Sequence, residues 1–220
     1  MPRHKNDRIL HRAGVIGDIH CEDIVLDRVL RHFCSIGADS ILSVGDVVDG
    51  LGNANKACAL LREHNVFTVA GNHDRWTIEE LMRTLPNATP KDGLTEENRA
   101  WLRQLPKTLT FETPMGTLLL CHGIGENDMA MVRPSHDGYA IEANLDLQML
   151  IKSKRYRFVV SGHSHEPMVR TIGKLTLINA GTLDRHDRQV CSVVDFDAAK
   201  VNFYDIGEDA ISEAELFALN

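Results

Sequence analysis

The sequence predicts an α/β fold, with a mainly parallel sheet built from strand, helix and strand units in its first seventy residues. Three apolar runs predict strands, and each ends at a glycine followed by polar residues: 13–16, 40–44 and 66–70. Apolar residues recur at helical spacing between the first two runs, from Leu26 to Phe33, and residues 53–64 predict a second helix. Because parallel strands need such crossovers, the alternation predicts the fold class.

The remaining elements follow in a less regular order. A capping box at Thr77 and Glu80 predicts the start of a helix, and residues 96–105 predict another that ends before Pro106. The tail, residues 208–219, has the apolar periodicity of a helix. Further strands are predicted at 109–113, 117–121, 157–161, 168–172, 175–179, 190–196 and 201–204, with turns of a hairpin at 114–116 and 173–174.

Length and composition predict one globular domain over residues 1–220, which is long enough to bury a full core. The polar, basic start and the absence of a long apolar run predict a cytoplasmic protein with no membrane partner. The net charge of -7 weighs against a nucleic-acid partner, because phosphate-backbone affinity needs clustered Lys and Arg. Five scattered cysteines suit a reducing compartment better than a disulfide framework.

Short clusters of Asp, Asn and His follow the ends of predicted strands. In open α/β sheets, ligands bind beyond the carboxyl ends of the strands, so clusters far apart in the sequence could converge on one site. The clusters lie at residues 17–20, 45–50, 71–74, 121–123 and 162–165.

These clusters predict a metal site. Asp18 and His20 are two residues apart, as are His163 and His165, so each pair presents its side chains on one face of an extended segment. Carboxylate, imidazole and amide ligands without thiolate favour two divalent transition-metal ions, with Mn expected first and Fe, Zn, Ni or Co as alternatives. The candidate ligands are Asp18, His20, Asp46, Asn72, His122, His163 and His165.

The ligands divide between two ions if Asp46 bridges them, and such ions typically lie about 3.5 to 4 Å apart. The first ion would be held by Asp18, His20, Asp46 and His165, and the second by Asp46, Asn72, His122 and His163.

The expected chemistry is hydrolysis of a phosphate ester. Two metals can lower the pKa of a shared water from about 15.7 to near 7 and hold the phosphoryl group for in-line attack by the bridging hydroxide. His73 is not needed as a ligand, so it can act as the general acid, and Asp49 can hold its imidazole in the useful tautomer.

The five clusters, in this order, resemble the calcineurin-like metallophosphoesterase superfamily. Its pattern of D-x-H, G-D-x-x-D, G-N-H-[DE], a strand ending in H, and G-H-x-H is met between Asp18 and His165. The resemblance implies a four-layer sandwich of two mixed β-sheets flanked by helices, the same metal ligands, and the His73–Asp49 pair. Chain length and residues 50–52 and 178–182 resemble the small bacterial and archaeal phosphodiesterase branch.

Several functions stay open at this point. The expected one is a phosphodiesterase on a small or nucleotide-like ester; the alternatives are a phosphomonoesterase or protein-phosphatase-like enzyme, a nuclease, and a scaffold of the same fold, like the retromer subunit that lacks the acid histidine. Related protein phosphatases have Arg where this chain has Gly50. The candidates to replace that cation are Arg75, Arg133, Arg185 and Arg188.

Three further features have roles that the sequence leaves open. Trp76 either lines the pocket or packs, His186 lies in a charged loop that could border the site, and the polar stretch 125–139 could set specificity. The sequence gives no indication of an oligomeric state.

Overall fold

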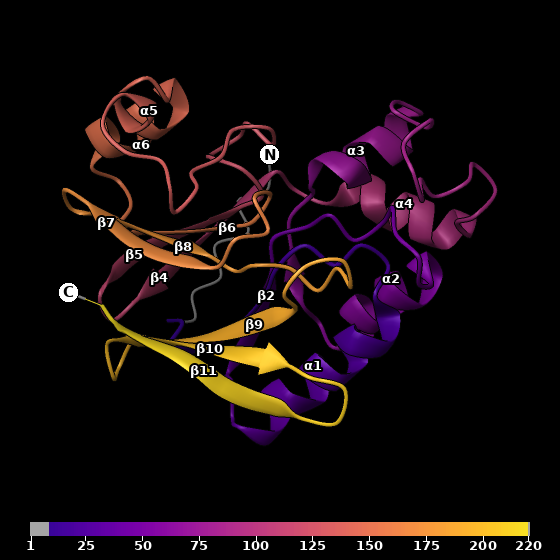
Figure 1. The fold of residues 1–220 in the computed structure, drawn as a ribbon, viewed down its shortest axis with the longest axis horizontal. Coiled ribbons are helices and arrows are strands. Elements are labelled where there is room, and N and C mark those ends of the chain that lie inside the picture. Colours follow the sequence, from indigo (N-terminus) through magenta and orange to yellow (C-terminus); the bar gives the residue numbers. More distant parts are fainter. Residues whose placement is uncertain (1–8, 220) are drawn as a thin grey trace.

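The computed structural model describes residues 9–219 of the chain, and the segment 1–8, on which the expectation of a cytoplasmic location partly rests, lies outside them. Two mixed β-sheets face one another (Figure 1). The first contains, in spatial order, β11 (Ile211–Ala218), β10 (Lys200–Ile206), β9 (Val190–Asp195), β1 (Arg12–Ile16), β2 (Ser40–Ser43) and β3 (Phe67–Thr68). The second contains β4 (Thr108–Thr113), β5 (Gly116–Cys121), β6 (Phe158–Ser161), β8 (Leu175–Asn179) and β7 (Met168–Ile172).

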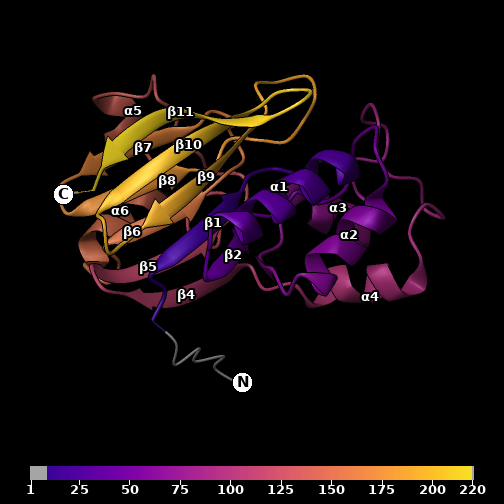
Figure 2. The ribbon, with the colours of Figure 1, turned by 90° about the horizontal axis from the view of Figure 1, so that it is seen from below.

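Helices cover the outer faces of both sheets. In Figure 2, α1 to α4 lie together at the right of the view, whereas α5 and α6 lie at its left. Their bounds are α1 (Asp23–Ser35), α2 (Ala54–Glu63), α3 (Asn72–Glu79), α4 (Glu96–Gln104), α5 (Tyr139–Glu142) and α6 (Leu145–Ser153).

Strand alternation shows how the layers pack. On β5, Leu118 and Leu120 point into the core between the sheets, whereas Leu119 belongs to the outer core under α5 and α6. A third core, which includes Ile16 and Phe33, lies between the first sheet and α1 and α2. A strand buried on both faces is apolar along its whole length, which explains the run of three leucines. The predicted four-layer sandwich of two mixed sheets is confirmed.

The parallel strands of the two sheets end at one edge of the molecule. β1, β2 and β3 are parallel to one another, and so are β5, β6 and β8. Backbone contacts join the sheets at this edge, because the Leu183 amide donates to the Asp18 carbonyl oxygen at 2.7 Å and Asp18 forms a β-bridge with Thr182. Segments that follow strands of both sheets are therefore brought together.

Most predicted elements are found within one to three residues of their expected bounds, but two predictions are wrong. The tail forms the edge strand β11 and not a helix, because its residues pair with β10 along a ladder whose register shifts opposite Phe203 and Tyr204, where Ala214 of the tail is skipped. The shift disturbs strict alternation, and the tail's pattern then resembles helical spacing. The capping box at Thr77 and Glu80 is also absent, since α3 already begins at Asn72 and Glu80 follows its last turn.

Helices α5 and α6 are not predicted from the sequence. α5 is a single turn, and the hydrophobic face of α6 is short. Asn144 caps α6 by accepting a hydrogen bond from the Leu147 amide at 3.0 Å. None of the helices within residues 9–219 is long and apolar enough to cross a bilayer.

We predict that Gly14→Ala destabilises the fold by overpacking, by about 1–3 kcal/mol. A Cβ at Gly14 on β1 would lie 2.5 Å from an atom of the Phe33 ring on α1. Urea unfolding measures the free energy, and Phe33→Leu, which removes part of the ring's bulk, should recover part of the loss in the double variant. Gly207→Ala is the control, because its Cβ would meet nothing closer than 3.4 Å. Additive effects of Gly14→Ala and Phe33→Leu would contradict the overpacking.

Candidate functional site

The predicted ligands come together where the parallel strands end. Asp18 and His20 follow β1, Asp46 follows β2, and Asn72 begins α3 just after β3. The other three come from the second sheet: His122 follows β5, and His163 and His165 follow β6. Two groups of potential ligand atoms form, Asp18 with His20 and His165, and Asp46 with His122 and His163; within each group all atoms lie within 4.8 Å of one another.

In the first group, the Nε2 atoms of two imidazoles face the same position. The Nε2 atoms of His20 and His165 lie 3.2 Å apart, and His165 Nε2 lies 3.8 Å from Asp18 Oδ1. The Nδ1 atoms are occupied, since His20 Nδ1 donates to the Asp49 carbonyl oxygen at 2.8 Å and His165 Nδ1 pairs with Asp187 Oδ2 at 2.6 Å. These partners leave Nε2 as the free lone pair of each ring, the arrangement of metal-binding histidines.

The second group repeats this arrangement around His122. Its Nδ1 donates to the Val44 carbonyl oxygen at 2.9 Å, so its Nε2 lone pair faces Asn72 Oδ1 at 2.9 Å and Asp46 Oδ2 at 3.3 Å. His163 completes the group, and its Nε2 is buried without a hydrogen-bond partner. An imidazole lone pair facing two oxygens is unfavourable unless a cation or a proton lies between them.

Asp46 lies between the two groups. Its Oδ2 is 3.3 Å from His122 Nε2 and 3.9 Å from His20 Nε2, while its Oδ1 accepts a hydrogen bond from the His73 amide at 2.8 Å. A carboxylate oxygen within reach of both groups can serve as a bridge between two ions.

The electrostatics of the cluster fit two cations. Asp18 and Asp46 are buried, at 0% and 2% exposure. Burial lowers the pKa of His122, but the charge of Asp46 and the hydrogen bond between them outweigh it and raise the pKa to about 10. The cluster therefore attracts positive charge at His122 Nε2, which a metal ion can supply in place of a proton. Nitrogen and oxygen donors without thiolate suit transition metals.

The backbone around the ligands is held in an unusual conformation. His20, Asp46, Asp49, His163 and His165 all have φ between 44° and 65°, the left-handed region that L-residues rarely adopt. Such conformations persist only where surrounding contacts impose them, and they are concentrated at functional sites.

Buried carboxylates supply those contacts. Asp18 accepts from the His163 amide at 3.0 and 3.1 Å, and Asp74 accepts from the amides of Val47 and Gly71 at 2.9 Å each. These hydrogen bonds join loops that are far apart in the sequence. The loops also approach closely, since a Cβ at Gly162 would lie 2.4 Å from Asp18 Oδ2.

His73 lies beside the metal ligands with one ring atom free. Its Nδ1 is 2.9 Å from Asp49 Oδ2, and its side chain is 22% exposed, so Nε2 can meet a bound molecule. Asp49 is itself held by Arg83, whose two terminal nitrogens donate to its oxygens at 2.9 and 2.7 Å. Burial raises the pKa of Asp49, but hydrogen bonds from His73 and Arg83 outweigh it and hold the pKa below its usual range.

A pocket of about 330 Å³ opens beside these groups, and its lining includes Trp76 and His186. The Trp76 ring meets the His73 ring edge to face, with centroids 4.8 Å apart. Arg185 is the candidate cation that lines the pocket, and it pairs with Glu22 at 2.5 and 2.8 Å.

The other candidate cations are engaged elsewhere. Arg75 pairs with Asp128, Arg133 with Glu166, and Arg188 with Asp205 and Glu215. Related protein phosphatases have an arginine directly after the second aspartate of this motif, where this chain has Gly50. That position has no room for a side chain here, because a Cβ at Gly50 would lie 1.9 Å from the His20 carbonyl oxygen.

Sequence reasoning missed two residues of this site. Arg83 lies in an irregular segment after α3, and no pattern in the sequence connects it with Asp49. Asp74 belongs to the third predicted cluster without a role, although an acid three residues after a glycine that precedes a helix is a signal for a capping residue.

Comparisons with known proteins identify relatives of this chain. Residues 12–199 match the family model described as the calcineurin-like phosphoesterase superfamily domain. Over 61 residues, 28% of this chain, the sequence is 38% identical to the uncharacterized protein MJ0912 of Methanocaldococcus jannaschii, and the match spans 25% of that protein's length.

Solved structures share the fold at low sequence identity. A metallophosphoesterase from Sphaerobacter thermophilus is 21% identical, with 90% of this chain and 88% of that chain covered and a TM-score of 0.67. An archaeal phosphodiesterase is 16% identical, with 89% and 99% covered and a TM-score of 0.55. A single mutant of Vps29 from Entamoeba histolytica is also 16% identical, with 95% and 99% covered and a TM-score of 0.56.

These likenesses show the fold, whereas the family model spans most of the chain, including every predicted ligand. The protein belongs to the calcineurin-like phosphoesterase superfamily.

Proposed function

We propose that this protein is a dinuclear-metal-dependent phosphodiesterase that acts on a small or nucleotide-like ester, with His73 as the general acid. The observation that carries the proposal is the convergence of two ligand groups around Asp46. His73, whose Nδ1 is bonded to Asp49, lines the pocket beside them. Two bound transition-metal ions, Mn first among them, would supply a water of lowered pKa and neutralise charge on the phosphoryl oxygens.

The chain's own residues account for proton transfer. A proton held at His73 Nε2 can pass to the leaving oxygen, while His73 Nδ1–H donates to Asp49 and keeps the ring oriented. Arg83 acts one step further away as a positioning residue, because its paired hydrogen bonds fix the Asp49 carboxylate. Asp49 also accepts from the Thr89 amide at 2.7 Å, so it cannot turn away from His73 without losing several bonds.

The charge of the pocket favours a diester over a monoester. Glu22 and Asp184 line it together with the metal ligands, and the positive charge of Arg185 is already matched by Glu22. A diester carries one negative charge near neutral pH, whereas a monoester carries nearly two. Apart from the proposed metal ions, the described lining therefore offers no unmatched cation for the second negative charge of a monoester.

A phosphomonoesterase or protein-phosphatase-like activity is the second candidate, because it would use the same ligands and the same acid. The crowding at Gly50 weighs against it, since it excludes the arginine that helps to hold phosphate in those relatives. A scaffold is the third candidate, and a Vps29 structure has the same fold. The filled ligand set and the ordered His73–Asp49 pair favour catalysis.

A reducing, cytoplasmic location is also part of the proposal. The cysteines are all unpaired, and four of them are buried: Cys21, Cys58, Cys121 and Cys191. Burial raises the pKa of Cys21 and of Cys121 to about 12, so these thiols pack as neutral groups.

Metal-stripped protein should regain hydrolysis of bis-p-nitrophenyl phosphate when Mn, Co, Ni, Zn or Mg is supplied, with Mn expected to give the highest rate. Asp46→Asn should lower the metal-dependent kcat by about 100-fold or more, because one amide cannot bridge two cations as a carboxylate does. The matched control is Asp205→Asn, a surface carboxylate paired with Arg188. Two ions bound per chain without turnover on any diester would contradict the proposed reaction.

His73→Ala should retain metal but lose most turnover on esters with poor leaving groups, because such oxygens need a proton as the bond breaks. For the phenyl ester of thymidine monophosphate, the expected loss in kcat is about 10²–10⁴-fold. The p-nitrophenyl ester, whose leaving group is stable as an anion, should lose much less.

The comparison of the two esters is the test, and metal analysis of the variant confirms that the ligands are intact. His11→Ala is the control, since that imidazole pairs with Asp197 on the surface. An equal loss on both esters would remove His73 from proton transfer.

A further inference from the structure

A second cavity lies at the opposite ends of the strands that carry the metal ligands. Its lining includes Gly116 at the start of β5, Arg157 just before β6 and Leu175 at the start of β8. These strands run parallel, and His122 and His163 follow their other ends. The length of β5, six residues, therefore separates the cavity from the ligands by roughly 15–20 Å.

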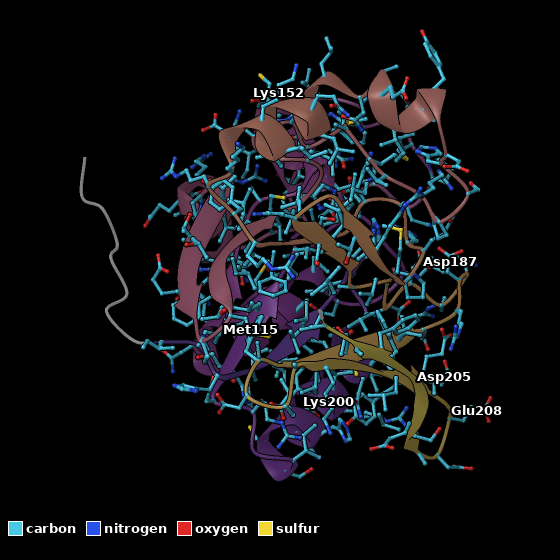
Figure 3. The ribbon with its side chains drawn as sticks, turned by 90° about the vertical axis from the view of Figure 1, so that its left-hand side faces the viewer. Met115, Lys152, Asp187, Lys200, Asp205 and Glu208 are labelled. Atoms are coloured by element: carbon cyan, nitrogen blue, oxygen red, sulfur yellow. The ribbon has the colours of Figure 1, made fainter. Side chains whose placement is uncertain are left out.

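The cavity is lined by cations and contains no carboxylate in its described lining. Lys154, Arg155 and Arg157 come from the segment between α6 and β6, and Lys174 comes from the turn between β7 and β8. Lys152, labelled at the top of the view in Figure 3, lies on α6 two residues before Lys154. This group stands out in a chain whose net charge is -7.

These cations are not neutralised within the part of the chain that the structure describes. Most other arginines have an acidic partner within 4 Å, such as Asp137 for Arg170 and Glu22 for Arg185, whereas the five cations here have none among residues 9–219. Arg157 donates to the Lys174 carbonyl oxygen at 2.5 Å, which joins the two segments without removing charge. Glu112 lies outside the lining and accepts a hydrogen bond at 3.2 Å from the hydroxyl of Thr117, which lines the cavity.

The size and remaining walls of the cavity narrow the ligand class. Its volume is about 580 Å³, within the roughly 300–1,000 Å³ of small-molecule sites. Leu150, Ile151, Tyr156 and Leu175 give it an apolar side, and the Arg155 guanidinium lies over the Tyr156 ring at 5.3 Å. A ligand that matches both walls carries more than one negative charge and also a flat or apolar body.

We propose that this cavity binds the phosphate groups and base of a nucleotide, at a site separate from the metal ligands. Convergent unpaired cations bind phosphate through charge-assisted hydrogen bonds, and the Arg155–Tyr156 pair offers a surface on which a base can stack. The same chemistry is present in a free nucleoside polyphosphate and at the end of a single-stranded nucleic acid. The proposal does not depend on the reaction carried out at the other edge of the sheets.

The test is calorimetric titration of the metal-loaded, full-length protein with ADP at low and at physiological salt. Wild-type protein should bind one more ADP per chain than the variant Arg155→Gln/Lys174→Gln, or bind it at least tenfold more tightly, and added salt should weaken that binding. The control variant Arg103→Gln/Lys200→Gln removes the same charge elsewhere, as Figure 3 shows for Lys200, and should match wild type. Hydrolysis of bis-p-nitrophenyl phosphate should be unchanged in both variants.

Equal stoichiometry and affinity for ADP in wild type and in Arg155→Gln/Lys174→Gln would overturn the proposal. An equal loss of ADP binding in the control variant Arg103→Gln/Lys200→Gln would also overturn it. Titrations with inorganic pyrophosphate and with a five-nucleotide oligomer then distinguish a free nucleotide from the end of a nucleic acid strand. Weaker binding of pyrophosphate than of ADP supports a contribution from the base. Tighter binding of the oligomer than of ADP, lost in the same variant, assigns the site to the end of a nucleic acid strand.

Discussion

The site depends on buried carboxylates that accept hydrogen bonds from the backbone of distant loops. Asp18 binds the His163 amide across 145 residues of sequence, Asp46 binds the His73 amide, and Asp74 binds the amides of Val47 and Gly71. A buried charge is costly unless such hydrogen bonds or counter-charges compensate for it. The same bonds hold several ligands in left-handed backbone conformations that they would not otherwise adopt. The carboxylates thus fix the loops and, in the proposed enzyme, also attract the metals, so fold and chemistry share one set of groups.

The two edges of the sheets have opposite electrostatic character. Carboxylates and imidazoles collect where the parallel strands end, with Asp187 close to His165, whereas unpaired cations collect where β5, β6 and β8 begin. Parallel strands make this division possible because all their carboxyl ends lie at one edge. One scaffold can therefore carry a metal centre and a phosphate site without a shared side chain.

Much of the fold and the grouping of the candidate ligands could be predicted from the sequence, because both depend on local patterns. Buried strands are apolar throughout, and each of the ligand clusters directly follows a strand. The tail could not be assigned, since its pairing with β10 and the register shift at Ala214 are tertiary features. Arg83 could not be found either, because its contact with Asp49 spans 34 residues and lies outside any motif. The requirement for glycine at position 50 likewise becomes clear only from the structure, because the His20 carbonyl oxygen leaves no room for a side chain there.

The central claim is that Asp46 holds two metal ions between the two ligand groups, and anomalous diffraction from crystals grown with Mn tests it most directly. The account predicts two anomalous peaks about 3.5 to 4 Å apart, with an Asp46 carboxylate oxygen between them. Asp18, His20 and His165 should surround one peak, and Asn72, His122 and His163 the other. A single peak, or two peaks of which only one contacts Asp46, would contradict the account.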